Sequence, residues 1–240
     1  MARVTAKAAA TGNAREFDLA VVKLRELNRF LHQDAVKEGV SRVRVVNPDG
    51  AHSIACGLNA GFDVEIDGHV GYYLAGMNKL ARVTVNGNAG PGVAENMMSG
   101  QVHVRGFAST AAGASAHGGC LIIDGDASLR CGIALKGGDI VIGGSVGSFS
   151  AFMAQAGRIV ICGDAGDALG DSLYEAIIYV RGNVRSLGAD ARFEPMSEAD
   201  LAAVAELLQK AGCSYEPKEF RRIASAKSLY HWNADANQEY

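Results

Sequence analysis

Short stretches that alternate between apolar and polar positions recur along the middle of the chain, and each of them ends in glycine. Two aliphatic residues flank one outward position, as in Val64-Glu-Ile-Asp-Gly68 and Ile178-Tyr-Val-Arg-Gly182. Alternation of aliphatic residues with period two indicates strands with one buried face. The glycines that close these stretches follow one another at a constant interval of 19 residues: Gly68, Gly87, Gly106, Gly125, Gly144, Gly163 and Gly182.

The rest of each repeat is rich in glycine and alanine, which argues against a helix in every repeat and therefore against a leucine-rich horseshoe. Stacking identical coils places each strand beside its counterpart in the next coil. The sequence therefore predicts a mainly β fold, a single-stranded right-handed parallel β-helix of about seven 19-residue coils. We expect the closing glycines to be corners whose backbone angles other residues cannot adopt.

The segment before the repeat predicts a helix and a lead-in strand. Apolar residues at helical spacing predict a helix over 16–37, with Asn13 and Glu16 capping its start and Gly39 ending it. Residues 43–46, which are mostly valine, predict the strand that leads into the first coil.

The segment after the repeat predicts a second helix, which begins at Ser197 with Asp200 in a capping box and ends at Gly212. Both flanking helices are expected to close the ends of the solenoid. We therefore divide the chain into an N-terminal helix with a lead-in strand (1–46), the β-helix (47–191), and a C-terminal helix with a docking tail (192–240).

The outward position of each strand changes character along the repeat. It is polar in the first three coils and apolar in the last four, at Ile122, Val141, Val160 and Tyr179. An exposed apolar strip needs a cover, either one of the chain's own terminal helices or a partner subunit. The strip is therefore a candidate partner interface. The aromatic residues Tyr230 and Trp232 of the tail join it, because they favour docking onto another surface.

Composition excludes several classes of partner and compartment. The chain has 30 glycines but only four prolines and a net charge of −3 with dispersed basic residues, so we expect no nucleic acid partner. No apolar run reaches membrane-spanning length, so we expect no membrane partner. Five scattered cysteines without a C-x-x-C motif favour reduced thiols in the cytoplasm.

Candidate catalytic chemistry is sparse. The six histidines are far apart, Cys120 and Cys131 alone cannot hold a cluster, and no nucleophile has an evident base. Asp67, Asp124 and Asp126 stand beside turns, which leaves a carbohydrate-active β-helix enzyme as one alternative. Few aromatic residues and no long loops accompany these acids. We therefore expect no catalytic, cofactor-binding or metal-binding residues on this chain.

Several motifs within the repeat resemble a known family. The resemblance covers roughly residues 26–191 and identifies the repeat as similar to the GXGXG β-helix, the C-terminal domain of the large subunit of glutamate synthase. Its most specific motifs are His69-Val-Gly-Tyr-Tyr73, Asn88-Ala-Gly-Pro-Gly92, Glu95-Asn-Met-Met-Ser-Gly100, Phe152-Met-Ala-Gln155 and Arg185-Ser-Leu-Gly188.

The resemblance implies a structural role. In glutamate synthases this domain packs between a glutamine amidotransferase domain and an FMN-binding barrel that carries an iron–sulfur cluster. This chain begins Met1-Ala2 instead of with the catalytic cysteine of such an amidotransferase. The resemblance therefore implies a non-catalytic subunit without a cofactor of its own. Its expected partners in a hetero-oligomer are a glutamine-amidotransferase-like subunit and an FMN-binding subunit with an iron–sulfur cluster.

Stand-alone versions of the domain resemble subunits of two enzymes. One is N-methylglutamate synthase (methylamine–glutamate N-methyltransferase), and the other is the archaeal-type glutamate synthase. We favour the first, because the alanine-rich sequence is typical of bacteria. A more distant resemblance, to the β-helix subunit of formylmethanofuran dehydrogenase, is a further alternative.

Overall fold

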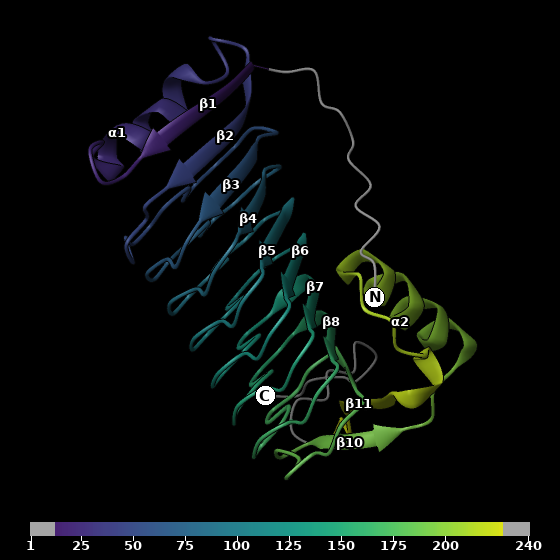
Figure 1. Ribbon diagram of the computed structural model, residues 1–240. Coiled ribbons are helices and arrows are strands. Elements are labelled where there is room, and N and C mark those ends of the chain that lie inside the picture. The colour runs from purple at the N-terminus through teal and green to yellow at the C-terminus, as the bar shows by residue number, and fades with distance from the viewer. Residues whose placement is uncertain (1–12, 228–240) are drawn as a thin grey trace, which may run out of the picture.

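The computed structural model describes residues 13–227, which form a β-solenoid (Figure 1). One eleven-stranded sheet runs through it in the order β1-β2-β3-β4-β5-β6-β7-β8-β9-β11-β10. About seven turns of about 19 residues follow one another, which confirms the predicted mainly β fold and coil length. The strands are β1 (Asn13–Asp18), β2 (Val40–Val46), β3 (Asp63–Asp67), β4 (Arg82–Val85), β5 (Gln101–Val104), β6 (Cys120–Ile123), β7 (Lys136–Ile142), β8 (Ala156–Ile161), β9 (Ile177–Val180), β10 (Ala191–Glu194) and β11 (Arg221–Ser225).

Strands β2 to β9 pair in parallel, each with its counterpart one coil further along the chain. Val64 pairs with Val83, and Ile159 pairs with Ile178. Because the partners stand one repeat apart, the buried faces of all strands point to the same interior. The second aliphatic residue of every predicted strand is completely buried there: Ile66, Val85, Val104, Ile123, Ile142, Ile161 and Val180.

A ladder of side chains joins the corners of the coils. His69 Nδ1 accepts a hydrogen bond from the backbone N–H of Asn88 (3.0 Å), and Asn88 Oδ1 accepts one from Phe107 (3.1 Å). Asp126, Ser145 and Asp164 repeat the contact, each accepting from the backbone one coil later at 2.7–3.0 Å. From His69 to Asp164, the residue after each closing glycine thus satisfies a corner N–H group of the next coil, except at Phe107.

One left-handed backbone position is glycine in four coils (Gly100, Gly119, Gly138 and Gly157), but three others in a coil do not depend on glycine. They stand five, seven and nine residues after the closing glycine, as at Tyr73 (φ 59°), Ala75 (φ 50°) and Met77 (φ 56°). The first of them donates its N–H to the next coil, from Tyr73 to the carbonyl oxygen of Pro91 at 2.9 Å. Intercoil hydrogen bonds therefore hold non-glycine residues in a conformation that costs energy in isolation.

The closing glycines are required for a reason other than the predicted one. Only Gly68 has a positive φ (135°); the other six do not. A Cβ atom on Gly87 would instead lie 2.4 Å from the carbonyl oxygen of Gly68, and one on Gly163 would lie 2.7 Å from that of Gly144. The prediction that left-handed backbone angles require glycine at these corners is therefore wrong for six of the seven. Glycine is required there because the backbones of successive coils lie too close together to leave room for a Cβ atom.

The N-terminal end differs from the predicted helix over 16–37. Residues 13–18 form β1, which pairs in parallel with β2 and supplies the hydrogen bonds that an open edge would lack. Asn13 and Glu16 therefore lie in a strand and do not cap a helix. The helix is shorter, α1 (Leu24–Arg29) continued by a π-helical turn (Phe30–Asp34), and its buried side chains Leu27, Phe30 and Leu31 join the solenoid core.

The C-terminal end closes the sheet with antiparallel strands. β11 pairs with β9 on one side and with β10 on the other, so parallel stacking stops after β9. Between β10 and β11 the chain forms the predicted helix, α2 (Glu198–Ala211), and a short 3₁₀ turn (Pro217–Glu219). Gly212 ends α2 in the left-handed conformation (φ 70°), as predicted.

Replacing Gly87 by alanine tests the close approach between coils. The added Cβ would meet the Gly68 carbonyl oxygen, so we expect the free energy of unfolding to fall by about 2 kcal/mol. That loss should lower the thermal midpoint by about 5 °C. Gly61→Ala is the matched control, because nothing lies within 4 Å of a Cβ at Gly61. Equal melting temperatures for the two variants would contradict this explanation.

Candidate functional site

Helix α2 covers the apolar strip on the outer face of the sheet. Val141 and Val160 are 0% exposed and Tyr179 is 1% exposed, and all three pack in one cluster with residues of α2 and the following segment. Ile122, the fourth residue of the predicted interface, is also buried. The strip is therefore not available to a partner subunit, which corrects its assignment as an interface in favour of the other alternative, a cover by the chain's own helix. Tyr230 and Trp232 lie outside the described residues.

The sequence of α2 explains why it lies on this strip. Val204, Leu207 and Leu208 are buried and stand at helical spacing, so they form one apolar face. Ser197 Oγ accepts a hydrogen bond from the backbone N–H of Asp200 (3.2 Å), and an Asp200 carboxylate oxygen accepts from the N–H of Ser197 (2.8 Å). This capping box fixes the start of the helix, as the sequence predicts.

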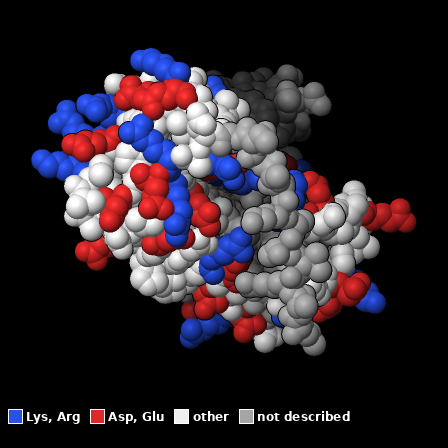
Figure 2. Space-filling view, turned by 45° about the horizontal axis from the view of Figure 1, so that its top comes forward, with Lys and Arg blue, Asp and Glu red and all other residues white. Residues whose placement is uncertain are grey.

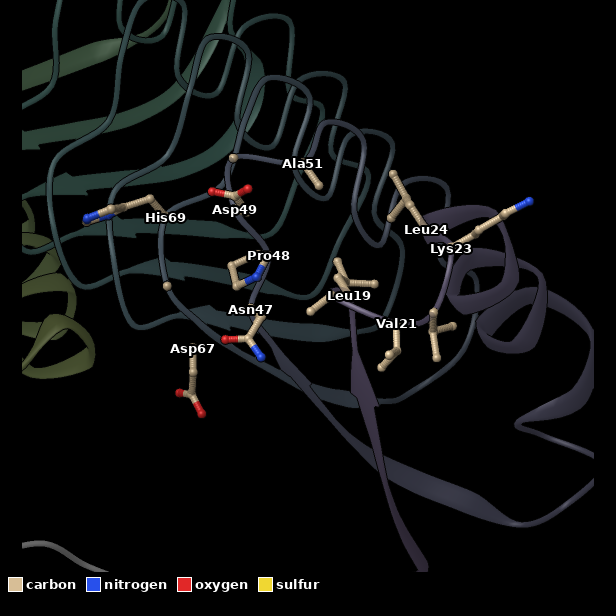
Figure 3. A pocket seen from close by; sticks show the side chains of 14 residues that line it. Leu19, Val21, Lys23, Leu24, Asn47, Pro48, Asp49, Ala51, Asp67 and His69 are labelled. Atoms are coloured by element: carbon tan, nitrogen blue, oxygen red, sulfur yellow. The ribbon is translucent and has the colours of Figure 1, made fainter.

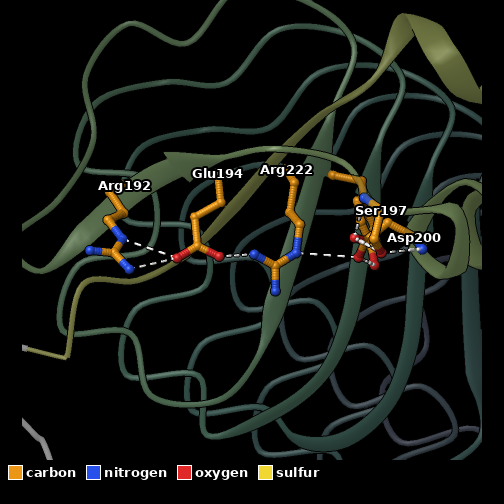
Figure 4. A network of polar contacts seen from close by, with 6 residues as sticks. Arg192, Glu194, Ser197, Asp200 and Arg222 are labelled. Carbon is orange, nitrogen blue, oxygen red and sulfur yellow. Dashed lines mark hydrogen bonds and ion pairs between the residues drawn. The ribbon is translucent and has the colours of Figure 1, made fainter.

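A polar network fastens the same helix to the last strands (Figure 4). The Tyr179 hydroxyl donates to Asp200 Oδ1 at 2.7 Å, and Arg222 Nε donates to the same oxygen at 3.2 Å. Arg222 also pairs with Glu194, which accepts from Arg192 Nη2 at 2.8 Å. The network thus connects β9, α2, β11 and β10.

The pKa shifts in this network keep it in one protonation state. Burial acts to raise the pKa of Asp200, but hydrogen bonds from Ser197 and Tyr179 and the charge of Arg222 together lower it. The pKa of Glu194 is lowered, chiefly by its hydrogen bond from Arg192. Burial, and then the hydrogen bond to Asp200, raise the pKa of Tyr179. The two carboxylates are therefore ionised and the phenol is neutral at pH 7.

The sheet face of the first coils is open and carries both signs of charge. Arg44 pairs with Asp67 at 2.7 Å and with Glu16 at 2.9 Å. A hollow of about 440 Å³ on this face is lined by Arg42, Arg82 and Arg105 as well as by acidic residues. Acidic and basic side chains are likewise interleaved in Figure 2, instead of forming a patch of one sign. The mixture is typical of a solvated surface.

A cleft of about 1080 Å³ lies where the lead-in segment meets the first coil (Figure 3). Leu19, Val21 and Leu24 lie toward one side of it and His69 toward the other. His69 accepts the corner hydrogen bond described above, and Asp67 accepts hydrogen bonds from Arg44 and Asn86. His69 and Asp67 of the cleft are thus occupied by contacts within the solenoid, and Asp49, which also lines it, is exposed.

The acids considered for carbohydrate chemistry are occupied in the same way. Asp124 pairs with His103 at 2.6 Å, and Asp126 accepts the backbone N–H of Ser145 at 2.7 Å. With Asp67 bound to Arg44 and Asn86, all three acids hold neighbouring coils together. Within residues 13–227, no three His, Cys, Asp or Glu side chains are grouped so that they could hold a metal ion.

Cys120 and Cys131, the two cysteines considered for a cluster, lie on opposite faces of the solenoid wall. Cys131 lies in the solenoid core, where burial raises its pKa to about 12, whereas Cys120 lies on the outer face. The structure places Cys162 and Cys213 in the apolar cluster beneath α2, where each thiol affects the pKa of the other. The sequence contains one signal for this pair, since Cys162 stands at an outward strand position next to the apolar strip.

The side of the solenoid formed by the left-handed turns carries few charged residues. We define the turn face as the residues four and five positions after the six closing glycines from Gly68 to Gly163: Tyr72, Tyr73, Pro91, Gly92, Thr110, Ala111, Leu129, Arg130, Ser148, Phe149, Asp167 and Ala168. Tyr72, Tyr73, Leu129 and Phe149 are 43–48% exposed. Only Arg130 and Asp167 carry charge. The alternating aliphatic pattern that predicts the strands and the core does not reveal this surface.

Fold and contacts together define a β-solenoid protein that covers part of its sheet with its own C-terminal helix. No protein-family model matches the chain. Protein GlxC of Rhizobium meliloti (strain 1021) is 52% identical to it over 224 residues, which cover 93% of this chain and 98% of GlxC. The chain belongs to the GlxC family. Among the helices of residues 13–227, none is long and apolar enough to cross a membrane.

Replacing Asp200 by asparagine tests the network that holds α2. We expect the free energy of unfolding to fall by about 2 kcal/mol at pH 7, because a buried charge-assisted contact with Arg222 is lost. The pKa of Asp200 is lower in the folded state than in the unfolded state. Its contribution is therefore complete above about pH 4 and disappears as the pH falls through the folded-state pKa.

Urea denaturation from pH 7 to pH 3 measures this difference. The gap between wild type and Asp200→Asn should narrow below about pH 4. Asp49→Asn is the matched control, because Asp49 is exposed and makes no ion pair among the described contacts. A gap that stays constant over the whole pH range would show that the charge of Asp200 does not stabilise the fold.

Proposed function

We propose that this protein is the non-catalytic β-helix subunit of a glutamate-synthase-type complex, and specifically of an N-methylglutamate synthase (methylamine–glutamate N-methyltransferase). In this complex it joins a glutamine-amidotransferase-like subunit to an FMN-binding subunit with an iron–sulfur cluster. Glutamine hydrolysis and flavin chemistry belong to those partners. The chain itself supplies a rigid surface on which both are held.

The observation that carries the proposal is the position of the family-like motifs in the solenoid. His69 and Asn88, which open two of these motifs, belong to the ladder of corner side chains. The resemblance to the glutamate synthase β-helix therefore falls on residues that build the scaffold. Homology to GlxC over 98% of its length supports the same view, because the shared sequence makes up nearly all of that protein.

The distribution of polar groups supports a structural role. Asp67, Asp124 and Asp126 each have a hydrogen-bonding or charged partner in a neighbouring coil. A catalytic site needs at least one acid, base or nucleophile directed at a reacting atom. Here the candidates are used to stack coils, which favours a scaffold over the carbohydrate-active alternative.

The turn face is the surface that we assign to a partner subunit. It combines exposed aromatic and aliphatic side chains with only two charges among twelve residues. Depletion of charge and enrichment of Tyr and Phe are typical of the centre of protein interfaces. The apolar strip on the sheet is already covered by α2, which leaves the turn face as the long apolar surface of the repeat.

Co-expression with the two partner subunits tests the proposed function. A tagged copy of this chain should retain both partners through size-exclusion chromatography, and the complex should have flavin absorbance. The isolated chain should have no bound flavin and should not hydrolyse glutamine. Glutamine turnover by the pure chain, or full activity of the two partners without it, would rule out the proposal.

Methylamine and ammonia assays of the complex separate N-methylglutamate synthase from glutamate synthase. Co-purified molybdenum or tungsten would favour the formylmethanofuran dehydrogenase alternative.

Substitutions on the turn face test the assigned interface. The double variant Tyr73→Glu/Phe149→Glu places two charges at exposed apolar positions and should weaken partner binding at least about tenfold in a titration. Its melting temperature should change little, because both side chains are about half exposed. Val36→Glu is the control, since Val36 is 65% exposed and lies near the N-terminal helix. Equal loss of binding in the control would reject the assignment.

A further inference from the structure

Two cysteines from distant parts of the chain meet where the end of α2 rests on the sheet. Cys162 directly follows β8, and its backbone N–H donates to the carbonyl oxygen of Ile142 at 2.9 Å. Cys213 directly follows Gly212, and its N–H donates to the carbonyl oxygen of Leu208 at 2.9 Å. Both backbones are thus fixed, one by the sheet ladder and the other by the end of the helix.

The two cysteines belong to the same apolar cluster. Tyr215, two residues after Cys213, packs against Arg181, and Arg181 Nε donates to the carbonyl oxygen of Cys162 at 2.8 Å. Cys162 is 0% exposed, and Cys213 packs against the same cluster while remaining partly exposed. The mutual influence of the two thiols lowers the pKa of Cys213 and raises the pKa of Cys162. A solvent-accessible thiol that ionises readily beside a protonated neighbour has the arrangement of an attacking and a resolving cysteine.

We propose that Cys162 and Cys213 form a reversible disulfide that fastens the end of α2 to the solenoid, with small disulfides of the glutathione class as the oxidant. The thiolate of Cys213 attacks one sulfur of the small disulfide, whose S–S bond breaks and releases one small thiolate. Cys162 then gives up its proton and attacks the Cys213 sulfur of the mixed disulfide, which releases the second thiolate. Two protein thiols are oxidised by two electrons, and one small disulfide is reduced to two thiols.

The position of the bond determines what it controls. α2 covers Val141, Val160 and Tyr179 and is held at its start by the capping box and Asp200. Toward its end, α2 is held by apolar packing, by an ion pair between Glu206 and Arg158 of β8 at 3.6 Å, and by the cation–π contact between Arg181 and Tyr215. A disulfide at this end adds a covalent attachment away from the network that Asp200 forms at the start of the helix. Oxidation therefore changes how firmly the cover stays on the apolar strip.

Peptide mapping of the full-length chain tests the bond. The reduced protein is incubated with glutathione disulfide, its remaining thiols are alkylated, and it is digested with trypsin. Cleavage after Arg158, Arg181, Lys210 and Lys218 places the two cysteines in peptides 159–181 and 211–218. We expect these peptides to be linked, and Cys56, Cys120 and Cys131 to be alkylated after unfolding. Stable glutathione on Cys213 with an alkylated Cys162, or no linked peptide, would overturn the proposal.

Thermal unfolding provides the second measurement. Oxidation should raise the midpoint by about 5–10 °C, and Cys213→Ser should abolish this shift while melting like the reduced wild type. Cys120→Ser is the matched control, because Cys120 is also partly exposed and lies on the sheet face close to Lys210 of α2. It should retain the full shift. A shift lost in the control and kept in Cys213→Ser would assign the oxidation to another pair.

Discussion

The structure depends on the hydrogen bonds that each coil makes with the next. From β3 to β9 the paired strand residues stand one 19-residue repeat apart, except at the start of β7, and the turns and corners add their own bonds in the same direction. The coils come so close that a Cβ atom at most closing glycines would meet backbone atoms of the preceding coil. Backbone groups are obligatory donors and acceptors, so a solenoid that satisfies them between coils must keep a constant coil length.

The same contacts explain the scarcity of convergent polar groups. Histidine, asparagine, aspartate and serine after the closing glycines accept backbone hydrogen bonds, and outward acids pair with basic or amide side chains of neighbouring coils. Polar side chains are therefore distributed along the solenoid axis, one for each coil. Recognition of other molecules is left to surfaces outside the stacking contacts, above all the turn face and the regions beyond the repeat.

Much of the fold followed from the sequence because one repeat unit determines the rest. The interval between Gly68 and Gly87 predicted coil length, strand positions and core, and Ser197 with Asp200 predicted the start of α2. β1 was missed because six residues without strong alternation become a strand only when an edge is available for pairing. Two features depend on how α2 folds back onto the sheet: the burial of Val160 and the proximity of Cys162 and Cys213. The local sequence pattern does not predict that path.

The two ends of the sheet also fix the size of the molecule. β1 occupies one edge together with α1, and antiparallel β11 and β10 occupy the other, so the parallel stack cannot grow by adding copies of itself. Between these ends the strands rise by about 4.8 Å for each coil. Inserting or deleting one residue in a strand would turn its buried side chains outward. Loss of a whole coil would instead leave the same strand pairing and the same kinds of intercoil hydrogen bonds between the remaining coils. In evolution the length of such a protein can therefore change only in whole-coil steps, which makes it a molecular spacer of discrete lengths.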